Sequence, residues 1–265
     1  MLFLLFLRIL RPSNEVFLII LPTNMTFNIN CIVLHAFMFN DSKMMVDVLS
    51  REEGRLSCVL NIGRSKAGRG RRQLFQPLSI LELTLDRKAP GLLATVKDAH
   101  VAVAFANIPF DPYKLAISMF LAEFIANVTR SEKESEVLFD YISESLQWLD
   151  GARKDFSNFH LVFMMRLTRF VGFFPNLEDY SEGCAFDMQN GCFVDWAPQQ
   201  RGFLTGDDAT KMQTLMRMNY DNMRLFKMSH ADRNRCLDVI TDYYRLHVAD
   251  FREMKSLSIL RELFA

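Results

Sequence analysis

Five strand-like segments limit the folds open to this chain more than any other feature of its sequence. Each is rich in β-branched, aromatic or aliphatic residues with partial alternation, and together they cover residues 28–39, 43–50, 55–61, 75–86 and 92–103. Turn-forming residues separate the first three segments, with Asn40-Asp41-Ser42 in one turn and Gly54 in the next. Five strands in roughly 75 residues, joined by short turns, predict a small closed β-barrel of the oligonucleotide-binding (OB) type. An SH3-like barrel accounts for the strand count nearly as well.

After residue 105 the hydrophobic period becomes helical. Asp111-Pro112 is typical of a helix start, and boxes of the form Ser-x-x-acid at Ser131 and Ser229 predict two more. Helical spacing also covers residues 158–171, 209–226 and 256–264, whereas in residues 180–207 we expect at most a short hairpin of 191–194 with 202–204. We therefore predict an α+β fold, with an N-terminal five-stranded OB-type barrel at 25–105 and a C-terminal α-helical bundle domain at 106–265. An irregular insert would lie at about 176–207.

The first 24 residues form two short apolar runs around Arg8, Arg11 and Pro12. Each run is far below the roughly 20 apolar residues that cross a bilayer. The charges stand in the middle rather than at the start, and no small-residue cleavage site of a signal peptide follows. We expect translation to begin at Met25, which makes residues 1–24 a mis-assigned leader; a membrane anchor is the alternative.

Charge and cysteine content exclude some classes of protein. The formal net charge is zero, which argues against a histone-like polybasic binder. Residues 25–105 nevertheless hold 11 Lys and Arg against 7 Asp and Glu, a net charge of +4, and residues 106–265 hold 18 against 23, a net charge of −5. Five scattered cysteines lack the spacing of a disulfide framework, so we expect reduced thiols and a cytoplasmic protein with no membrane partner. Nucleoid association is expected only if the protein binds DNA.

A wholly basic, glycine-punctuated stretch lies between the third and fourth predicted strands. We interpret it as a loop, and an isolated loop of this kind is usually a solvated turn. Here it joins strands of a barrel type that commonly binds nucleic acid, and several cations can neutralise phosphates without regard to base sequence. We therefore predict a DNA-binding site at Arg64, Lys66, Arg69, Arg71 and Arg72, extended by Lys43, Arg51 and Arg55 on or near the second and third strands.

Motifs for catalysis and for metal binding are missing from the sequence. It contains no phosphate-binding P-loop, no G-x-S-x-G and no H-E-x-x-H, and its five histidines stand apart, so we expect no enzyme. Cys184 and Cys192 stand eight positions apart in the irregular segment. A structural zinc site needs four ligands, usually as two close pairs, so we expect neither zinc nor another cofactor.

The helical half offers one candidate for binding a partner protein. Arg166 and Arg169 stand three positions apart among apolar residues that include Phe163 and Phe170. They are either arginines at the edge of a core helix or the rim of an apolar groove. Such a groove would suit a short acidic peptide with a free carboxylate.

Several segments together resemble the RecO family of DNA repair proteins, in the form found in Bacteroides-like bacteria. The resemblance covers close to 90% of the chain and rests on residues 31–41, 44–57, 64–78, 110–125, 158–180 and 192–194. It implies an OB domain and a helical domain, and no enzymatic turnover. It also implies binding and annealing of single- and double-stranded DNA, with RecR and often RecF as partners, as in the RecFOR pathway of DNA recombination after DNA damage. RecA would load onto DNA coated by single-strand binding protein, whose acidic C-terminal tail docks on the helical domain.

Two departures from the family accompany this resemblance. Many relatives hold zinc through four cysteines in the irregular segment, where this chain keeps only Cys184 and Cys192, and residues 1–24 have no counterpart. Two other functions remain open from the sequence. One is an OB-fold RNA-binding or translation accessory protein, and the other is a structural adaptor whose basic loop contacts an acidic protein.

Overall fold

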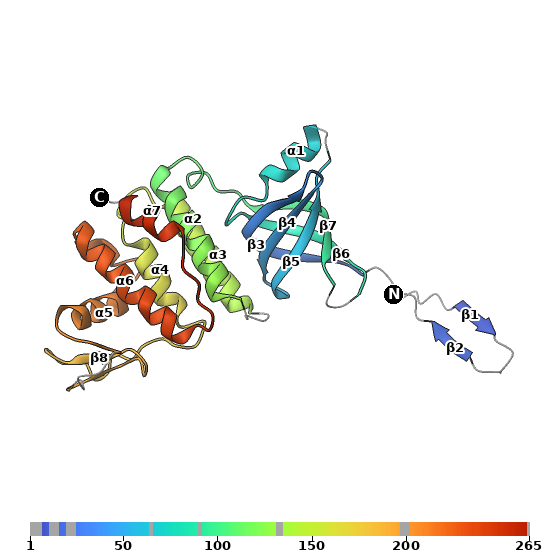
Figure 1. The fold of residues 1–265 in the computed structure, drawn as a ribbon. Helices are drawn as coiled ribbons and strands as arrows, with labels where there is room; N and C mark the ends of the chain where they lie inside the picture. The colour runs from blue at the N-terminus through green and yellow to red at the C-terminus, as the bar shows by residue number, and fades with distance from the viewer. Residues whose placement is uncertain are drawn as a thin grey trace.

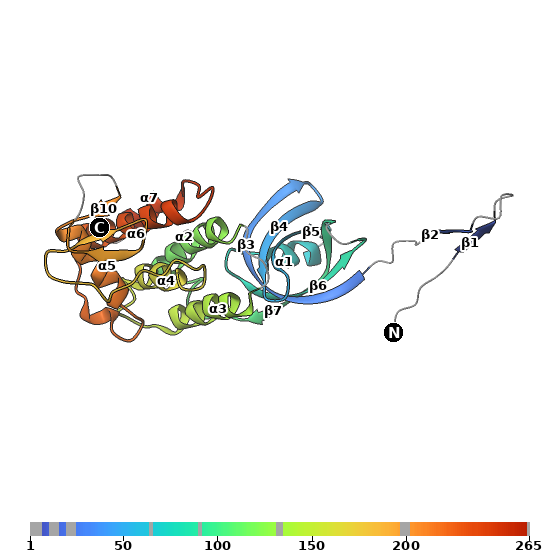
Figure 2. The ribbon, with the colours of Figure 1, turned by 90° about the horizontal axis from the view of Figure 1, so that it is seen from below.

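The computed structural model describes residues 7–10, 16–19, 25–63, 66–89, 92–130, 135–196 and 202–263. A β-barrel and a group of helices lie side by side, with β3 on the side of the barrel towards α2 (Figures 1 and 2). Near the N-terminus, β1 (Leu7–Leu10) and β2 (Val16–Ile19) form an antiparallel pair. Among the described residues, no helix is long and apolar enough to cross a membrane.

The barrel is closed and five-stranded, which confirms the predicted OB-type fold. Its strands follow the order β3-β4-β5-β7-β6, and β6 returns to pair with β3. All neighbours are antiparallel except β5 and β7, which pair in parallel from Cys58 opposite Ala94 to Leu60 opposite Val96. The strands are β3 (Met25–Asn40), β4 (Lys43–Ser50), β5 (Gly54–Asn61), β6 (Ile80–Arg87) and β7 (Ala94–Val103).

The basic stretch differs from the prediction, because most of it is a helix rather than a loop. α1 (Lys66–Gln73) lies across one end of the barrel (Figure 1). Gly68 and Gly70 in the stretch disfavour a helix, although arginine is a good helix former, and Phe75, which is 2% exposed, follows the helix and packs into the barrel interior. The fourth predicted strand is correspondingly shorter, since β6 begins at Ile80 and not at residue 75.

The helical domain begins as its caps predict. Asp111 accepts hydrogen bonds from the backbone N–H of Tyr113 at 2.9 Å and of Lys114 at 3.1 Å, and the Ser229 capping box is present. The box predicted at Ser131 lies outside the described residues, and Ser135 caps the next helix instead. The helices are α2 (Pro112–Val128), α3 (Glu136–Gly151), α4 (Phe159–Leu167), α5 (Asp207–Arg217), α6 (His230–His247) and α7 (Ser256–Leu263).

Two predicted helix ends and one predicted strand pairing in this half differ in the structure. The helix expected over residues 158–171 ends at Leu167, and the one expected over 209–226 ends at Arg217, with a 3-10 turn (Met223–Leu225) beyond it. The expected hairpin is wrong, because its two strands, β9 (Cys192–Val194) and β10 (Phe203–Leu204), do not pair. Each instead pairs with β8 (Ala185–Asp187), an unpredicted central strand.

The apolar core of the helical domain extends across the domain junction onto the barrel, whose interior forms a separate buried cluster. Ile32, Leu34 and Leu78 of the barrel domain are at most 2% exposed and belong to the same buried cluster as Ile117 and Phe120 of α2. This contact places the outer surface of β3 next to the helices. The junction is therefore packed, and it fixes which barrel residues face solvent and which face the helical domain.

Candidate nucleic-acid interface

The first part of the candidate interface is α1 and the chain that enters it. Lys66, Arg69, Arg71 and Arg72 all belong to this helix, and its first turn has no acidic residue. Arg72 is exposed, whereas Arg71 is half-buried because its guanidinium donates a hydrogen bond to the carbonyl oxygen of Lys97. The predicted Arg64 lies outside the described residues. The helix therefore places Arg71 and Arg72 at one end of the barrel, with Lys66 and Arg69 earlier in the same helix.

Lys43 lies beside the end of β5, from which the chain leads into α1. It is exposed at the start of β4, opposite Asn61 at the end of β5, two residues before Gly63. The backbone N–H of Ile62 donates to the carbonyl of Ser42 at 2.8 Å, which ties the β3–β4 turn to the chain that leads into α1. Lys43 thus extends the positive end of the barrel onto its side.

An aromatic surface runs along β3 from this end. Phe39 is 66% exposed and Phe37 is 46% exposed, and the ring of Phe37 lies 5.4 Å from that of the exposed His35, measured between centroids. Phe37 is opposite Met45 on β4, and Met45 is opposite Val59 on β5. Exposed rings beside cations are the combination that stacks bases and holds phosphates of a single strand.

Sequence reasoning missed these three rings, although a signal for them was present. His35 and Phe37 alternate along one predicted strand and so point to the same face, and Phe39 follows two residues later, where the β3–β4 pairing is irregular between Met38 and Asn40. Buried residues precede them, since Val33 and Leu34 are at most 2% exposed. Apolar residues at period two usually face a core, so only their position at the outer end of a long strand distinguishes them as a surface.

Arg51 and Arg55 lie at the opposite end of the barrel from α1, where they contact the helical domain. Arg51 forms two hydrogen bonds of 3.0 Å with the carboxylate of Asp140 and lies 3.4 Å from that of Glu136. A hydrogen bond from Arg51 and its positive charge lower the pKa of Asp140. The structure therefore separates Arg51 from the α1 cluster and engages it between the domains.

Arg55 is also partly occupied. Its guanidinium lies 3.8 Å from the carboxylate of Asp47 and donates to the carbonyl of Ala126 at 3.3 Å and to Thr129 Oγ1 at 3.4 Å. Burial is the main cause that lowers the pKa of Arg55. Of the eight predicted DNA-binding residues, the described part of the chain thus brings Lys43, Lys66, Arg69, Arg71 and Arg72 to one end of the barrel.

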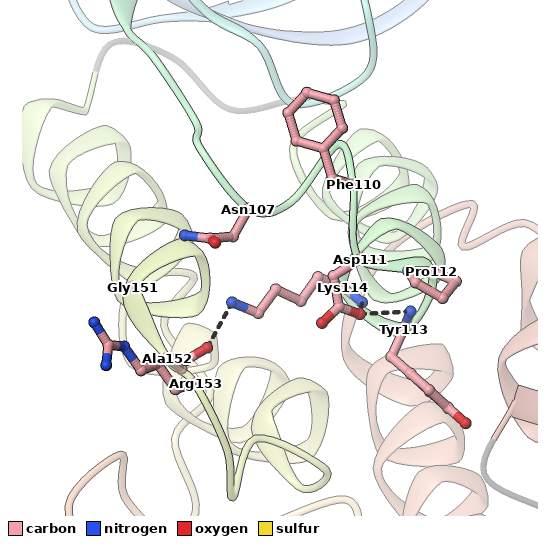
Figure 3. A pocket seen from close by; sticks show the side chains of 9 residues that line it. All are labelled: Asn107, Phe110, Asp111, Pro112, Tyr113, Lys114, Gly151, Ala152 and Arg153. Atoms are coloured by element: carbon pink, nitrogen blue, oxygen red, sulfur yellow. Dashed lines mark hydrogen bonds between the residues drawn. The ribbon is translucent and has the colours of Figure 1, made fainter.

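At the connection between the domains lies a pocket of about 680 Å³ (Figure 3), and the polar groups that line it are engaged in hydrogen bonds within the protein. The buried Lys114 side chain donates to the carbonyl oxygens of Asp150 at 2.8 Å and Ala152 at 2.6 Å. The carboxylate of Asp150 accepts from three backbone N–H groups of residues 106–108 at 2.7–2.9 Å. These bonds position the chain between barrel and bundle, so both polar groups have a structural role.

The predicted partner-binding residues are only partly accessible. Phe163 is fully buried in the core and cannot contact a partner unless the bundle rearranges. Arg166 is half-buried and donates to the carbonyl of Met218 at 3.2 Å. Arg169 is exposed above the ring of Phe174, 4.0 Å from its centroid, and Phe170 is half-buried. The accessible part of this site is therefore Arg169 with Phe170.

The two cysteines of the irregular segment do not gather further ligands. Cys192 is opposite Asp187 in the β8–β9 pair, and Cys184 is buried just before β8. Within the part of the chain that the structure describes, no group of three or more His, Cys, Asp or Glu side chains is placed to hold a metal ion.

Comparison with known proteins matches both domains. The family model described as recombination protein O N terminal matches residues 25–105, and the one described as recombination protein O C terminal matches residues 109–257. The DNA repair protein RecO of Phocaeicola vulgatus is 48% identical over 234 residues, which are 88% of this chain and 97% of that protein. The RecO protein of Bacteroides fragilis is 44% identical with the same coverage. The RecO protein of Flavobacterium psychrophilum is 27% identical over 242 residues, which are 91% of this chain and 100% of that protein.

Proposed function

Since the chain belongs to the RecO family and has its role in DNA repair and recombination, we propose that it is a non-enzymatic mediator that binds and anneals DNA strands. With RecR, it would help RecA to load onto DNA coated by single-strand binding protein. The observation that carries this proposal is the match of both domains to the family models, together with 48% identity to the RecO protein of Phocaeicola vulgatus over 88% of this chain.

The arrangement of charge on the barrel supports a role for α1 and Lys43 in holding the DNA backbone. Lysines and arginines at one end of a barrel release counterions when they bind phosphates, and this gives affinity that does not depend on base sequence. The exposed rings of Phe37 and Phe39 next to Lys43 provide stacking surfaces for bases. A strand held in this way has its charge partly neutralised, so a complementary strand approaches it with less repulsion.

The helical domain is the proposed site for protein partners, including RecR, RecF and the acidic tail of single-strand binding protein. Arg169 and the neighbouring Phe170 combine an exposed guanidinium with an aromatic face. An arginine next to apolar surface suits a carboxylate-bearing peptide. Among the described residues, Arg169 takes part in no ion pair.

Annealing of complementary oligonucleotides, naked or coated by single-strand binding protein, tests the proposal. The triple variant Lys66→Glu, Arg69→Glu and Arg72→Glu should anneal slowly. Its log–log salt slope for single strands should fall by about 2, at about 0.7 per phosphate contact. Arg71 stays unchanged because it is bound to the barrel. A control that reverses three exposed charges of the helical domain, Arg153, Lys154 and Arg224, alters the net charge equally.

The outcomes separate the possible functions. Annealing by the α1 triple variant at the wild-type rate would contradict the proposal that α1 binds the phosphates of the DNA backbone. Preference for RNA over DNA in competition would contradict a role as a DNA mediator. If Arg169→Glu leaves binding of a fluorescent acidic tail peptide unchanged, the proposed peptide site is wrong, while the annealing function stands or falls by the first measurement.

A further inference from the structure

A cleft of about 480 Å³ with both apolar and charged lining residues lies between the outer surface of the barrel and the helical domain. One wall comes from β3, β4 and β5, with His35, Asp47 and Arg55. The opposite wall comes from α2, its C-terminal end and the chain before α7. The polar residues of this second wall are Glu123, Asn127, Arg130, Arg252, Glu253 and Lys255. The cleft is therefore built by segments that are far apart in sequence and meet only at the domain junction.

Among the described residues, four cations line this cleft, and two of its three carboxylates already accept hydrogen bonds from other groups. Glu123 accepts the backbone N–H groups of Lys255 at 3.0 Å and Ser256 at 2.8 Å, so it caps the start of α7. Asp47 accepts the hydroxyl of Ser57 and faces Arg55 at 3.8 Å. The remaining carboxylate in the lining is Glu253, which is exposed.

Arg130, Arg252 and Lys255 are exposed, and no ion pair involves any of the three among the residues described. Arg130 and Arg252 differ from Lys255 because both also line an adjoining pocket with residues 249–251, of which Asp250 is acidic. Within the described residues, the side chain of Arg130 donates one hydrogen bond, to Asn127 Oδ1 at 3.3 Å. Burial lowers the pKa of Arg55, Asp47 opposes that effect, and the positive charge of Arg130 lowers it further. An anion between the guanidinium groups of Arg55 and Arg130 would relieve the repulsion between these two cations.

The cleft continues the aromatic surface of β3. His35 belongs to the lining of the cleft, and its ring centroid lies 5.4 Å from that of Phe37. His35, Asp47 and Ser57 form one row across β3, β4 and β5, and Phe37, Met45 and Val59 form the next row towards α1. A strand that stacks bases on Phe39 and Phe37 thus reaches the cleft one row later, at the end of the barrel away from α1.

We propose that this cleft is a second phosphate-binding site, in which Arg130 and Arg252 hold backbone phosphates of one DNA strand that leaves the aromatic surface of β3. The inference rests on the proposed DNA-binding function and extends it from the barrel to the helical domain. The adjoining rings favour nucleic acid over an acidic peptide, because stacking surfaces in series with cations suit a chain of bases and phosphates. The confined cleft suits a single backbone and not a duplex.

Binding of labelled single-stranded and duplex DNA of equal length, titrated with salt, tests the site. In the double variant Arg130→Ala and Arg252→Ala, the loss of two phosphate contacts should lower the single-strand log–log slope by about 1.4. If the wild-type and variant isotherms converge at 1 M salt, this difference corresponds to about 25-fold weaker binding at 0.1 M. Duplex binding should change much less.

The matched control is Arg153→Ala with Arg224→Ala, which removes two exposed arginines of the same domain outside the cleft. Equal slopes for the cleft variant and this control would overturn the proposal, as would an equal loss for single strands and duplex. Loss of acidic-peptide binding with unchanged DNA binding would assign the cleft to a protein partner and refute it. A failure of the proposed function looks different, because then the wild type itself would not bind DNA and the α1 triple variant would match it.

Discussion

Replacing the two exposed phenylalanines of β3 separates base stacking from charge in the proposed mechanism. Phe39 is 66% exposed and Phe37 is 46% exposed, so one ring has most of its surface free and the other about half. Stacking of a base on an aromatic side chain contributes about 1–3 kcal/mol when tested by alanine substitution. The double variant Phe37→Ala and Phe39→Ala should therefore lose about 2–6 kcal/mol of single-strand affinity, which is at least about 30-fold.

The same exposures predict only a small effect on folding. Complete burial of a phenylalanine stabilises a protein by about 1.5–3 kcal/mol, so the buried parts of these two side chains contribute about 1.3–2.6 kcal/mol in total. A domain of ordinary stability, about 5–15 kcal/mol, tolerates that loss. Thermal unfolding of the variant should show a modestly lower midpoint with the cooperativity of the wild type.

Fluorescence anisotropy with a labelled oligonucleotide at several salt concentrations measures both effects. Because no charge changes, the log–log slope should stay at its wild-type value while the whole line moves to weaker binding. Phe110→Ala is the matched control, since that ring is 83% exposed in the connection between the domains. Wild-type affinity in the β3 variant, or an equal loss in the Phe110 variant, would refute base stacking on β3.

Two further predictions concern the connection and core shared by the domains. Burial by itself raises the pKa of Asp150, but the backbone N–H groups of Ile108, Ala106 and Asn107 outweigh this and, with Lys114, hold the pKa below its usual value. A depressed carboxyl pKa stabilises the fold above the unfolded pKa of about 3.9 and loses that contribution as pH falls through the folded value. Acid unfolding followed by circular dichroism should thus show Asp150→Asn less stable than wild type at neutral pH, with the difference vanishing at the acid end; a constant difference contradicts the assignment. Leu34→Ala should cost about 2–5 kcal/mol and shift unfolding reported by Trp148 of the helical domain, whereas an unshifted Trp148 transition means that the domains unfold independently.

The order of the elements was predictable because it depends on local signals. The Asp111 and Ser229 caps each supply side-chain acceptors to backbone N–H groups within three residues, so sequence alone identifies both helix starts. α1 was not predictable in this way. Gly68 and Gly70 disfavour a helix, and the packing of Phe75 into the barrel depends on strands distant in sequence.

The candidate site shows the same division between local and long-range information. A cluster such as Arg69, Arg71 and Arg72 is visible in the sequence, since its members are adjacent. The engagement of Arg51 with Asp140, 89 positions away, is not visible, and neither is the meeting of Arg130 with Arg55 in the cleft. Burial of Phe163 likewise depends on partners from several helices. Residue type thus predicted which side chains are able to bind phosphate, and only the fold distinguishes those that are free to do so.

In the proposed function, the contacts between the domains limit how many cations of the barrel are available to bind DNA. Asp140 engages Arg51, and Asp47 with the end of α2 engages Arg55, so two cations of the barrel serve the junction rather than a phosphate. The helical half carries a net charge of −5, which on average disfavours a nucleic-acid backbone. In the proposed mechanism a strand would therefore have favourable contacts along α1, the β3 rings and the cleft, and fewer elsewhere. Such a path would hold one strand with its bases accessible, and a limited affinity would let the duplex leave once the complementary strand has paired.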